Sequence, residues 1–176
     1  ISAHILVALQ QVVSRKADPK TPSVLSFGKV IAEGATNVIP NEVNIEGTFR
    51  TLNEVWRKEA HSQMLKIANG IAEGMGGEVE FEIRKGYPVL KNEPELTQRA
   101  ITAAEEYLGK ENVLDIDIWM AAEDFSYYTQ EIDGCFYRLG TRNEAKGIIS
   151  SVHTPTFDID EDALGISTGL MAYIAL

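Results

Sequence analysis

The sequence predicts a mixed α and β protein in two parts, a ferredoxin-like unit that lacks its first strand and part of an α/β domain. Three observations predict this. Residues 1–85 follow the order helix, strand, strand, helix, strand; the remaining residues alternate helices with short strands; and the segment "GYPVLKNEPEL", with two prolines, separates the parts. A complete ferredoxin-like unit has the order β-α-β-β-α-β. One strand is therefore missing, and we expect it to precede Ile1.

Hydrophobic periodicity predicts each element of the first part. Ile5, Leu9 and Val12 recur at helical spacing, whereas "EVNIEGTFR" and "EVEFEIR" alternate apolar and polar residues as half-buried strands do. Asn53 is a suitable N-cap for the second helix. The predicted elements are a helix over 1–16, strands over 23–33 and 42–50, a helix over about 54–74 and a strand over 78–84.

The second part contains shorter predicted elements. They are a helix over 94–108 that Gly109 ends, an apolar extended stretch over 113–120, a short helix that opens at "AEDF", a strand over 135–140 and a helix over about 161–176. This is the order of an α/β domain, but it is short for a sheet covered on both faces. We therefore expect half of such a domain, with domain boundaries of 1–86 and 87–176.

Composition limits the classes of partner. Acidic residues outnumber basic ones by 26 to 16, which gives a formal net charge of −10. Nucleic acids and anionic membrane surfaces need clustered lysine and arginine, so neither is an expected partner. The single cysteine, Cys135, excludes an internal disulfide and fits a reducing, cytoplasmic location. No apolar run reaches about 18 residues, so no membrane-spanning helix is predicted.

The start of the chain is unusual. It opens at Ile1 in a helical pattern, with neither an initiator methionine nor a helix start signal. We expect such a chain to begin within a longer protein, and the missing strand and the half-sized α/β part lead to the same expectation.

His153, in the loop "SSVHTPTF", has two interpretations. It is an ordinary loop histidine bonded to a backbone carbonyl, or it is a metal ligand. A zinc-type site needs three or four ligands from His, Cys, Asp or Glu. His4 and His61 fall on predicted helices of the other part. Within this chain His153 therefore forms a metal site only if carboxylates complete it.

Asn37 and Arg50 form a second candidate pair. Asn37 lies in the loop "GATNVIPN", and Arg50 lies at the end of the following strand. They are a turn asparagine and a solvated arginine, or they are an amide and a guanidinium that converge on a substrate carboxylate. Arginine can bind a carboxylate through two parallel hydrogen bonds.

Two weaker candidates lie further along the chain. Glu123 and Asp124 begin a predicted short helix, where acidic residues cap the helix or complement its dipole. Gly140 follows a predicted strand, where its backbone amide could face a ligand. Neither observation alone indicates a site.

Six segments in this order resemble one family: "ALQQVVSR", "GATNVIPNEVNIEGTFRT", "GYPVLKNEPEL", "MAAEDFSYY", "FYRLGT" and "HTPTFDIDEDAL". Together they are similar to the metal-dependent amidohydrolases of the aminoacylase/carboxypeptidase family, in the branch of hippurate hydrolases and N-acyl-amino-acid amidohydrolases. The resemblance implies a catalytic domain with two divalent metal ions, zinc or manganese, and an inserted ferredoxin-like lid that mediates homodimerisation. It makes 1–86 most of the lid and 87–176 the C-terminal part of the catalytic domain.

The resemblance also implies roles for single residues. His153 matches the last metal ligand; its partner ligands and the catalytic glutamate lie upstream in the family and are absent from this chain. Asn37 and Arg50 match lid positions that hold the carboxylate end of the substrate. Gly140 and Thr141 match a loop near the substrate.

The same resemblance leaves this chain without a catalytic residue. Glu123 and Asp124 match a motif beside the site to which no catalytic step is assigned. The family's lid histidine, which helps to stabilise the oxyanion, would lie upstream of Ile1, and His4 does not match it.

Two functions from different classes remain open. The first is hydrolysis of N-acyl amino acids or related small amides by a longer enzyme, of which these residues alone are inactive. The second is a non-catalytic, ferredoxin-like module that mediates dimerisation or interaction. Metal content separates the two, because an interaction module would bind none with useful affinity.

Overall fold

The computed structural model describes all residues of the chain, Ile1–Leu176. Contacts divide it into two compact units, Ile1–Val89 with Trp119–Ala122, and Leu90–Ile118 with Glu123–Leu176. The sequence predicted boundaries of 1–86 and 87–176 and did not predict that Trp119–Ala122 groups with the first unit. Whether these units are a lid and part of a catalytic domain stays a prediction.

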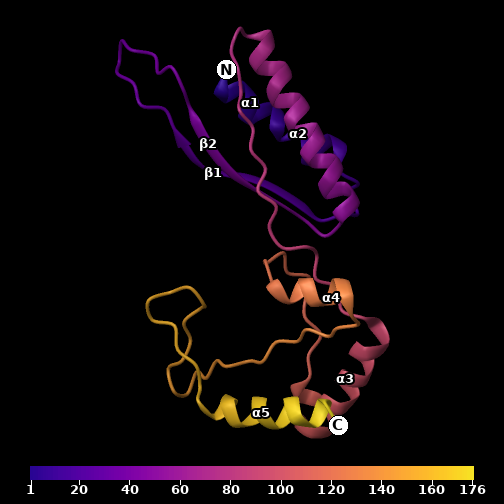
Figure 1. The fold of residues 1–176 in the computed structure, drawn as a ribbon. Coiled ribbons are helices and arrows are strands. Elements are labelled where there is room, and N and C mark those ends of the chain that lie inside the picture. The colour runs from indigo at the N-terminus through magenta and orange to yellow at the C-terminus, as the bar shows by residue number, and fades with distance from the viewer. The chain divides into compact units, whose positions relative to one another are not determined.

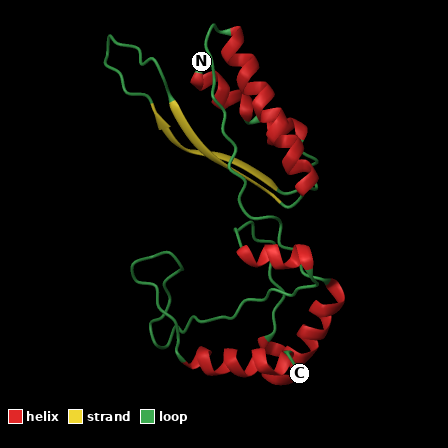
Figure 2. Ribbon diagram, viewed as in Figure 1, coloured by secondary structure: helices red, strands yellow, loops and turns green.

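The first unit consists of two α-helices, a π-helical turn and one β-hairpin (Figures 1 and 2). Its elements are α1 (Ser2–Leu9), a π-helical turn (Val12–Lys16), β1 (Ser23–Ile31), β2 (Asn44–Thr51) and α2 (Glu54–Gly74). The helix expected over 1–16 is thus interrupted after Leu9. The strands pair antiparallel, with Ser23 opposite Thr51 and Ile31 opposite Asn44, and a bulge interrupts the register between Phe27 and Lys29.

The core of this unit lies between the helices and one face of the hairpin. Leu9 and Val12 are 2% and 0% exposed, and the facing side of α2 contributes alanines and larger apolar residues. The buried cluster comprises Ile5, Leu9, Val12, Trp56, Ala60, Met64, Ala68 and Ala72. Leu25, Phe27 and Phe49 of the hairpin pack against it half-buried. The predicted apolar stripe of Ile5, Leu9 and Val12 is therefore buried.

The first turn of α2 joins the helix to the hairpin. Asn53 caps the helix, because its Oδ1 accepts a hydrogen bond of 3.0 Å from the amide of Trp56. The Trp56 indole donates to the Ser23 hydroxyl at 3.1 Å, and that hydroxyl donates to Thr51 at 3.0 Å. Trp56 therefore buries its ring without leaving its N–H group unpaired.

The segment 78–84 is not a strand, which corrects the sequence prediction. The hairpin is the only sheet in the structure. Val79 and Phe81 nevertheless pack half-buried against the core cluster, and the alternating residues Glu78, Glu80 and Glu82 are exposed. The alternation was predicted correctly, but this segment pairs with no neighbouring strand. A strand requires such a partner.

The second unit is mainly helical. Its elements are α3 (Pro94–Leu108), 3₁₀ turns at Lys110–Asn112 and Asp124–Tyr127, α4 (Tyr128–Glu131) and α5 (Asp162–Ile174). The strands expected at 113–120 and 135–140 do not pair, for the same reason as 78–84. Instead, the side chain of Asn92 bonds both backbone groups of Phe136, each at 2.9 Å. One side chain thus replaces a neighbouring strand at this position.

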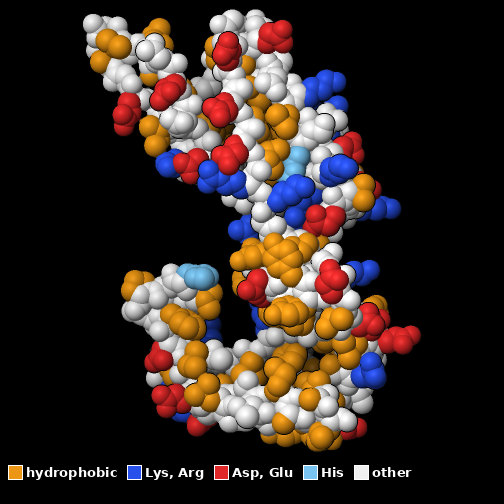
Figure 3. All heavy atoms as spheres, viewed as in Figure 1, with side chains coloured by type: hydrophobic (Ala, Val, Ile, Leu, Met, Phe, Trp, Pro, Cys, Tyr) orange, Lys and Arg blue, Asp and Glu red, His pale blue; other side chains and the backbone are white.

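Helices α3 and α5 pack together around a small core. Ala100 and Leu170 are buried, and the rings of Tyr107 and Tyr173 lie 5.5 Å apart. Figure 3 shows hydrophobic side chains on the surface of this unit. Leu114 and Ile118 are 77% and 72% exposed. Among the helices, none is both long and apolar enough to cross a lipid bilayer.

Candidate functional site

His153 lies exposed in the loop that precedes α5, after the turn at residues 144–147, with a backbone φ of 64°. This is the left-handed region, which histidine adopts more readily than most residues other than glycine. Its imidazole forms no hydrogen bond with the chain. The structure therefore does not show the bond to a backbone carbonyl that the ordinary interpretation requires.

Local hydrogen bonds shape the loop around His153. The hydroxyls of Ser150 and Thr156 lie 2.8 Å apart, on either side of the histidine. The Thr154 hydroxyl donates to the Ser151 carbonyl at 2.8 Å. The turn that contains the histidine is thus held by its own serine and threonine side chains, as in other polar turns.

The donor set of this chain does not complete a metal site. No three side chains among His, Cys, Asp and Glu lie close enough together to hold a metal ion. His4 and His61 belong to helices of the first unit. An exposed imidazole with neither nitrogen engaged fits one ligand position, but the structure does not assemble the three or four ligands that such a site needs.

Asn37 and Arg50 do not converge within one copy of the chain. Asn37 is in the loop that joins β1 to β2, beyond the pair Ile31–Asn44, and Arg50 is opposite Val24 near the other end of the hairpin. The six residue-to-residue steps from Asn44 to Arg50 span about 20 Å of strand. Figure 1 shows that loop at the opposite end of the hairpin from the start of α2.

Each of the two side chains has its own surroundings. Asn37 is exposed. The Arg50 guanidinium is also exposed and donates a hydrogen bond of 2.6 Å to the backbone carbonyl of Met120. The structure thus does not bring the two side chains together within one copy of the chain. Their expected roles as contacts to a substrate carboxylate stay a prediction.

The other candidates occupy defined positions in the second unit. Gly140 is exposed, and Thr141 is half-buried, with its carbonyl accepting a bond of 2.9 Å from the Asp160 amide. The Glu123 carboxylate accepts a bond of 3.1 Å from the Phe125 amide and so caps the following turn. Asp124 is exposed on that turn. For Glu123 the structure shows the capping interpretation.

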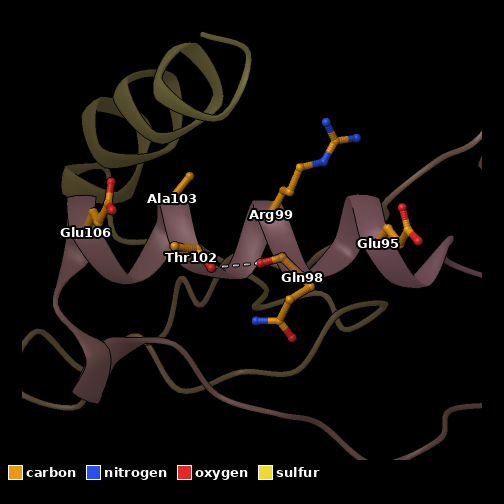
Figure 4. Close-up of a pocket in the computed structure, with 6 residues that line it drawn as sticks. All are labelled: Glu95, Gln98, Arg99, Thr102, Ala103 and Glu106. Atoms are coloured by element: carbon orange, nitrogen blue, oxygen red, sulfur yellow. Dashed lines mark hydrogen bonds between the residues drawn. The ribbon is translucent and has the colours of Figure 1, made fainter.

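Two surface hollows lie away from these candidates. One, of about 450 Å³, lies along α3 and is shown in Figure 4. Its lining residues are Glu95, Gln98, Arg99, Thr102, Ala103 and Glu106. Another, of about 650 Å³, lies between α1 and α2. Both are open to solvent, and neither brings together the residues that the sequence singled out.

Sequence reasoning missed a polar cluster beside the His153 loop. The Asp160 carboxylate accepts hydrogen bonds from Asn143 at 2.5 Å and from Lys146 at 2.6 Å. The bond from Lys146, and secondly that from Asn143, hold the pKa of Asp160 below its usual value. The bonds to Asp160 and Asp162 raise the pKa of Lys146. The residues of this cluster lie in the segments "TRNEAKG" and "DIDED". Contacts between two such loop segments leave no periodic pattern in the sequence, so the cluster could not be predicted.

Comparison with known proteins gives the family. Residues 7–176 match peptidase family M20/M25/M40, and the chain belongs to this family. The resemblance to the aminoacylase/carboxypeptidase family is thereby confirmed. The chain is 32% identical to thermostable carboxypeptidase 2 of Saccharolobus solfataricus, over all of this chain and 44% of that protein. It is also 32% identical to N-acetylcysteine deacetylase of Bacillus subtilis, over 99% of this chain and 44% of that protein.

A solved structure gives the same relationship. The YXEP protein of Bacillus subtilis, described as a dinuclear metal-binding peptidase of the M20 family, matches with a TM-score of 0.78 and 28% identity. The match covers 99% of this chain and 44% of that one. The chain thus spans less than half the length of the relatives that it matches.

Proposed function

We propose that this chain is the C-terminal part of a metal-dependent amidohydrolase, which hydrolyses the amide bond of N-acyl amino acids or related small amides. The family match over residues 7–176 carries the proposal. A deacetylase of an N-acetyl amino acid and a carboxypeptidase among the relatives both act on an amide bond next to an amino acid, which supports this substrate class.

His153 is assigned one ligand position of a site for two divalent metal ions, zinc or manganese. When bound, such ions activate water and polarise an amide carbonyl. Two properties of this chain support the assignment: the imidazole is exposed, and its nitrogens are not engaged by the protein. The ligands that complete the site would come from residues outside this chain.

Arg50 and Asn37 are assigned to the carboxylate end of the substrate. A carboxylate at Arg50 would replace the guanidinium's bond to the Met120 carbonyl. The charged acceptor makes the stronger bond of the two. About 20 Å of strand separates Arg50 from Asn44, and Asn37 lies in the loop beyond Asn44. The two contacts to one substrate can therefore come from different copies in a homodimer.

The remaining assignments concern the surroundings of the substrate. Gly140 and Thr141 are assigned to a loop beside it, where Thr141 offers its hydroxyl because its carbonyl is already bonded to Asp160. The first unit is assigned as a ferredoxin-like lid through which the protein forms a homodimer. A sheet of two strands leaves both outer edges open, and open edges favour pairing with another chain. The proposed location is cytoplasmic.

The test uses the complete protein that contains this chain. Hydrolysis of N-acetyl amino acids is measured before and after removal of metal with a chelator, and after zinc or manganese is added back. We expect activity that disappears with the metal and returns with it. His153→Ala should lower both metal content and activity by at least about tenfold, as loss of a metal ligand does. The matched control is His4→Ala.

Two results would contradict the proposal. Full activity in the chelated protein would remove the metal from the reaction. A complete protein that binds no metal and hydrolyses none of these amides, yet dimerises through residues 1–86, would favour the non-catalytic interaction module. The 176 residues alone should be inactive in the same assay, because they hold no complete metal site.

A further inference from the structure

The strongest unassigned feature is the polar cluster around Asp160. This carboxylate is 14% exposed, and it accepts hydrogen bonds from the Asn143 amide group and the Lys146 ammonium group. Its own backbone amide donates to the Thr141 carbonyl at 2.9 Å. Asp160, which lies just before α5, therefore forms hydrogen bonds with three residues of the preceding turn.

These bonds close a loop at its base. Asn143 and Ile148 exchange two backbone hydrogen bonds, of 3.0 and 2.9 Å, at the end of the turn. Asn143 also bonds Asp160, so the two ends of the segment 149–159 meet at one residue. His153 lies within that segment. Compact surface loops whose ends meet in this way are frequently functional.

Within the closed segment, little else holds His153. Its neighbours are exposed, and the bonds among them join serine and threonine side chains over a few residues. A non-glycine residue in the left-handed region is strained and persists where the surroundings enforce it. The base of the loop supplies a half-buried, charged anchor of that kind.

We propose that Asp160 is a positioning residue that closes the loop carrying His153 and fixes Thr141 beside the base of that loop. It acts through Asn143 and Lys146 and touches neither substrate nor metal. The metal-ligand role of His153 rests on the proposed function. The closure of the loop rests only on hydrogen bonds within this chain.

A neighbouring acid provides a matched control. Asp162 also accepts a bond from Lys146, at 2.6 Å, but its side chain is 79% exposed. It has no bond to Asn143 or Thr141. Asp162→Asn therefore removes a charge of the same sign, two positions away and on the same lysine, and leaves the base of the loop closed.

The experiment uses the complete protein with Asp160→Ala, Asn143→Ala, the double variant and the Asp162→Asn control. Hydrogen exchange of the amides in 149–157 reports closure, and zinc affinity, measured against a competing chelator, reports how the histidine is held. We expect faster exchange in both single variants and about tenfold weaker zinc binding, the scale of a lost outer-shell partner. The double variant should be no worse than Asp160→Ala, because both changes remove the same bond.

Asp160→Asn gives a graded check, because it keeps an oxygen acceptor for Asn143 and loses only the charge that Lys146 uses. Its exchange rates should fall between those of the unmodified protein and Asp160→Ala. Asn143→Ala lies outside α5, so it tests closure even if Asp160→Ala disturbs the start of that helix. Exchange in 149–157 that matches the unmodified protein in both single variants would overturn the proposal.

Failure of closure and failure of the proposed function give different results. If His153→Ala leaves zinc affinity unchanged while Asp160→Ala still accelerates exchange, the metal-ligand assignment is wrong and the closure is supported. If His153→Ala weakens zinc binding while exchange in 149–157 is unaffected by Asp160→Ala, the closure is wrong and the ligand assignment stands.

Discussion

Replacing Leu9 with alanine should destabilise the first unit strongly. Leu9 is 2% exposed and belongs to the cluster between α1 and α2. The change removes three buried carbons, worth about 0.8 kcal/mol each. The cavity left behind adds to this, and measured Leu→Ala changes in cores cost about 2.7–5.0 kcal/mol. Facing residues such as Ala60 and Ala68 are too short to fill the space. The hairpin covers only part of the cluster, so partial collapse limits the loss of unfolding free energy to about 3 kcal/mol.

Urea unfolding followed by tryptophan fluorescence measures this loss. Trp56 lies in the same cluster, and replacing the exposed Trp119 with phenylalanine leaves Trp56 as the only reporter. With an m-value near about 1.5 kcal/mol per molar, the midpoint should fall by about 2 M. Val7→Ala, on the same helix but 73% exposed, should change stability by less than about 0.5 kcal/mol. Equal midpoint shifts for the two variants would refute the assignment of Leu9 to the core.

Three smaller perturbations test other local features. Asn53→Ala removes the cap of α2 and should cost about 1 kcal/mol in the same urea titration, with Asn53→Ser restoring most of it. Gly109→Ala places a β-carbon at a φ of 88° and should lower the thermal midpoint, at a cost of about 1–3 kcal/mol. Burial, and secondly the charges of Arg57 and Lys85, lower the pKa of His61 below its ordinary 6.5. As the pH falls, His61 is protonated in the unfolded state before it is protonated in the folded state. The free energy of unfolding should therefore have its full value above pH 6.5 and decrease as the pH drops from 6.5 toward the folded pKa. His61→Gln should remove this dependence.

Helices were predicted from the sequence more completely than strands. The predicted bounds of α2 and α3 are those of the structure, and Asn53 caps α2 as expected. Periodicity, capping and a terminating glycine are all local signals, so they specify a helix without reference to the rest of the fold. Strand pairing is not local. Alternation predicted which side of 78–84 faces the core, but it carries no information on whether another backbone lies alongside.

The candidate site follows the same division. Residue type and loop context singled out His153, and the structure places it exposed with its imidazole unengaged. The positions of Asn37 and Arg50 were also identifiable, but their separation depends on the register of the hairpin, which the sequence does not state. Asp160 was not singled out, because its partners Asn143 and Lys146 become neighbours only when the turn folds back onto the start of α5.

The unpaired extended segments show that burial and pairing place a chain in different ways. Val79 and Phe81 pack on the same cluster as the hairpin residues Leu25 and Phe27, although their segment makes no ladder bond to the hairpin. Apolar burial is non-directional, so it can position the segment over the helices by itself. Hydrogen bonds between backbones are directional and need a partner at a fixed spacing. An extended segment can therefore bury the side chains that its alternation predicts without being part of a sheet. Alternation predicts which side chains are buried, and pairing in addition needs a neighbouring strand.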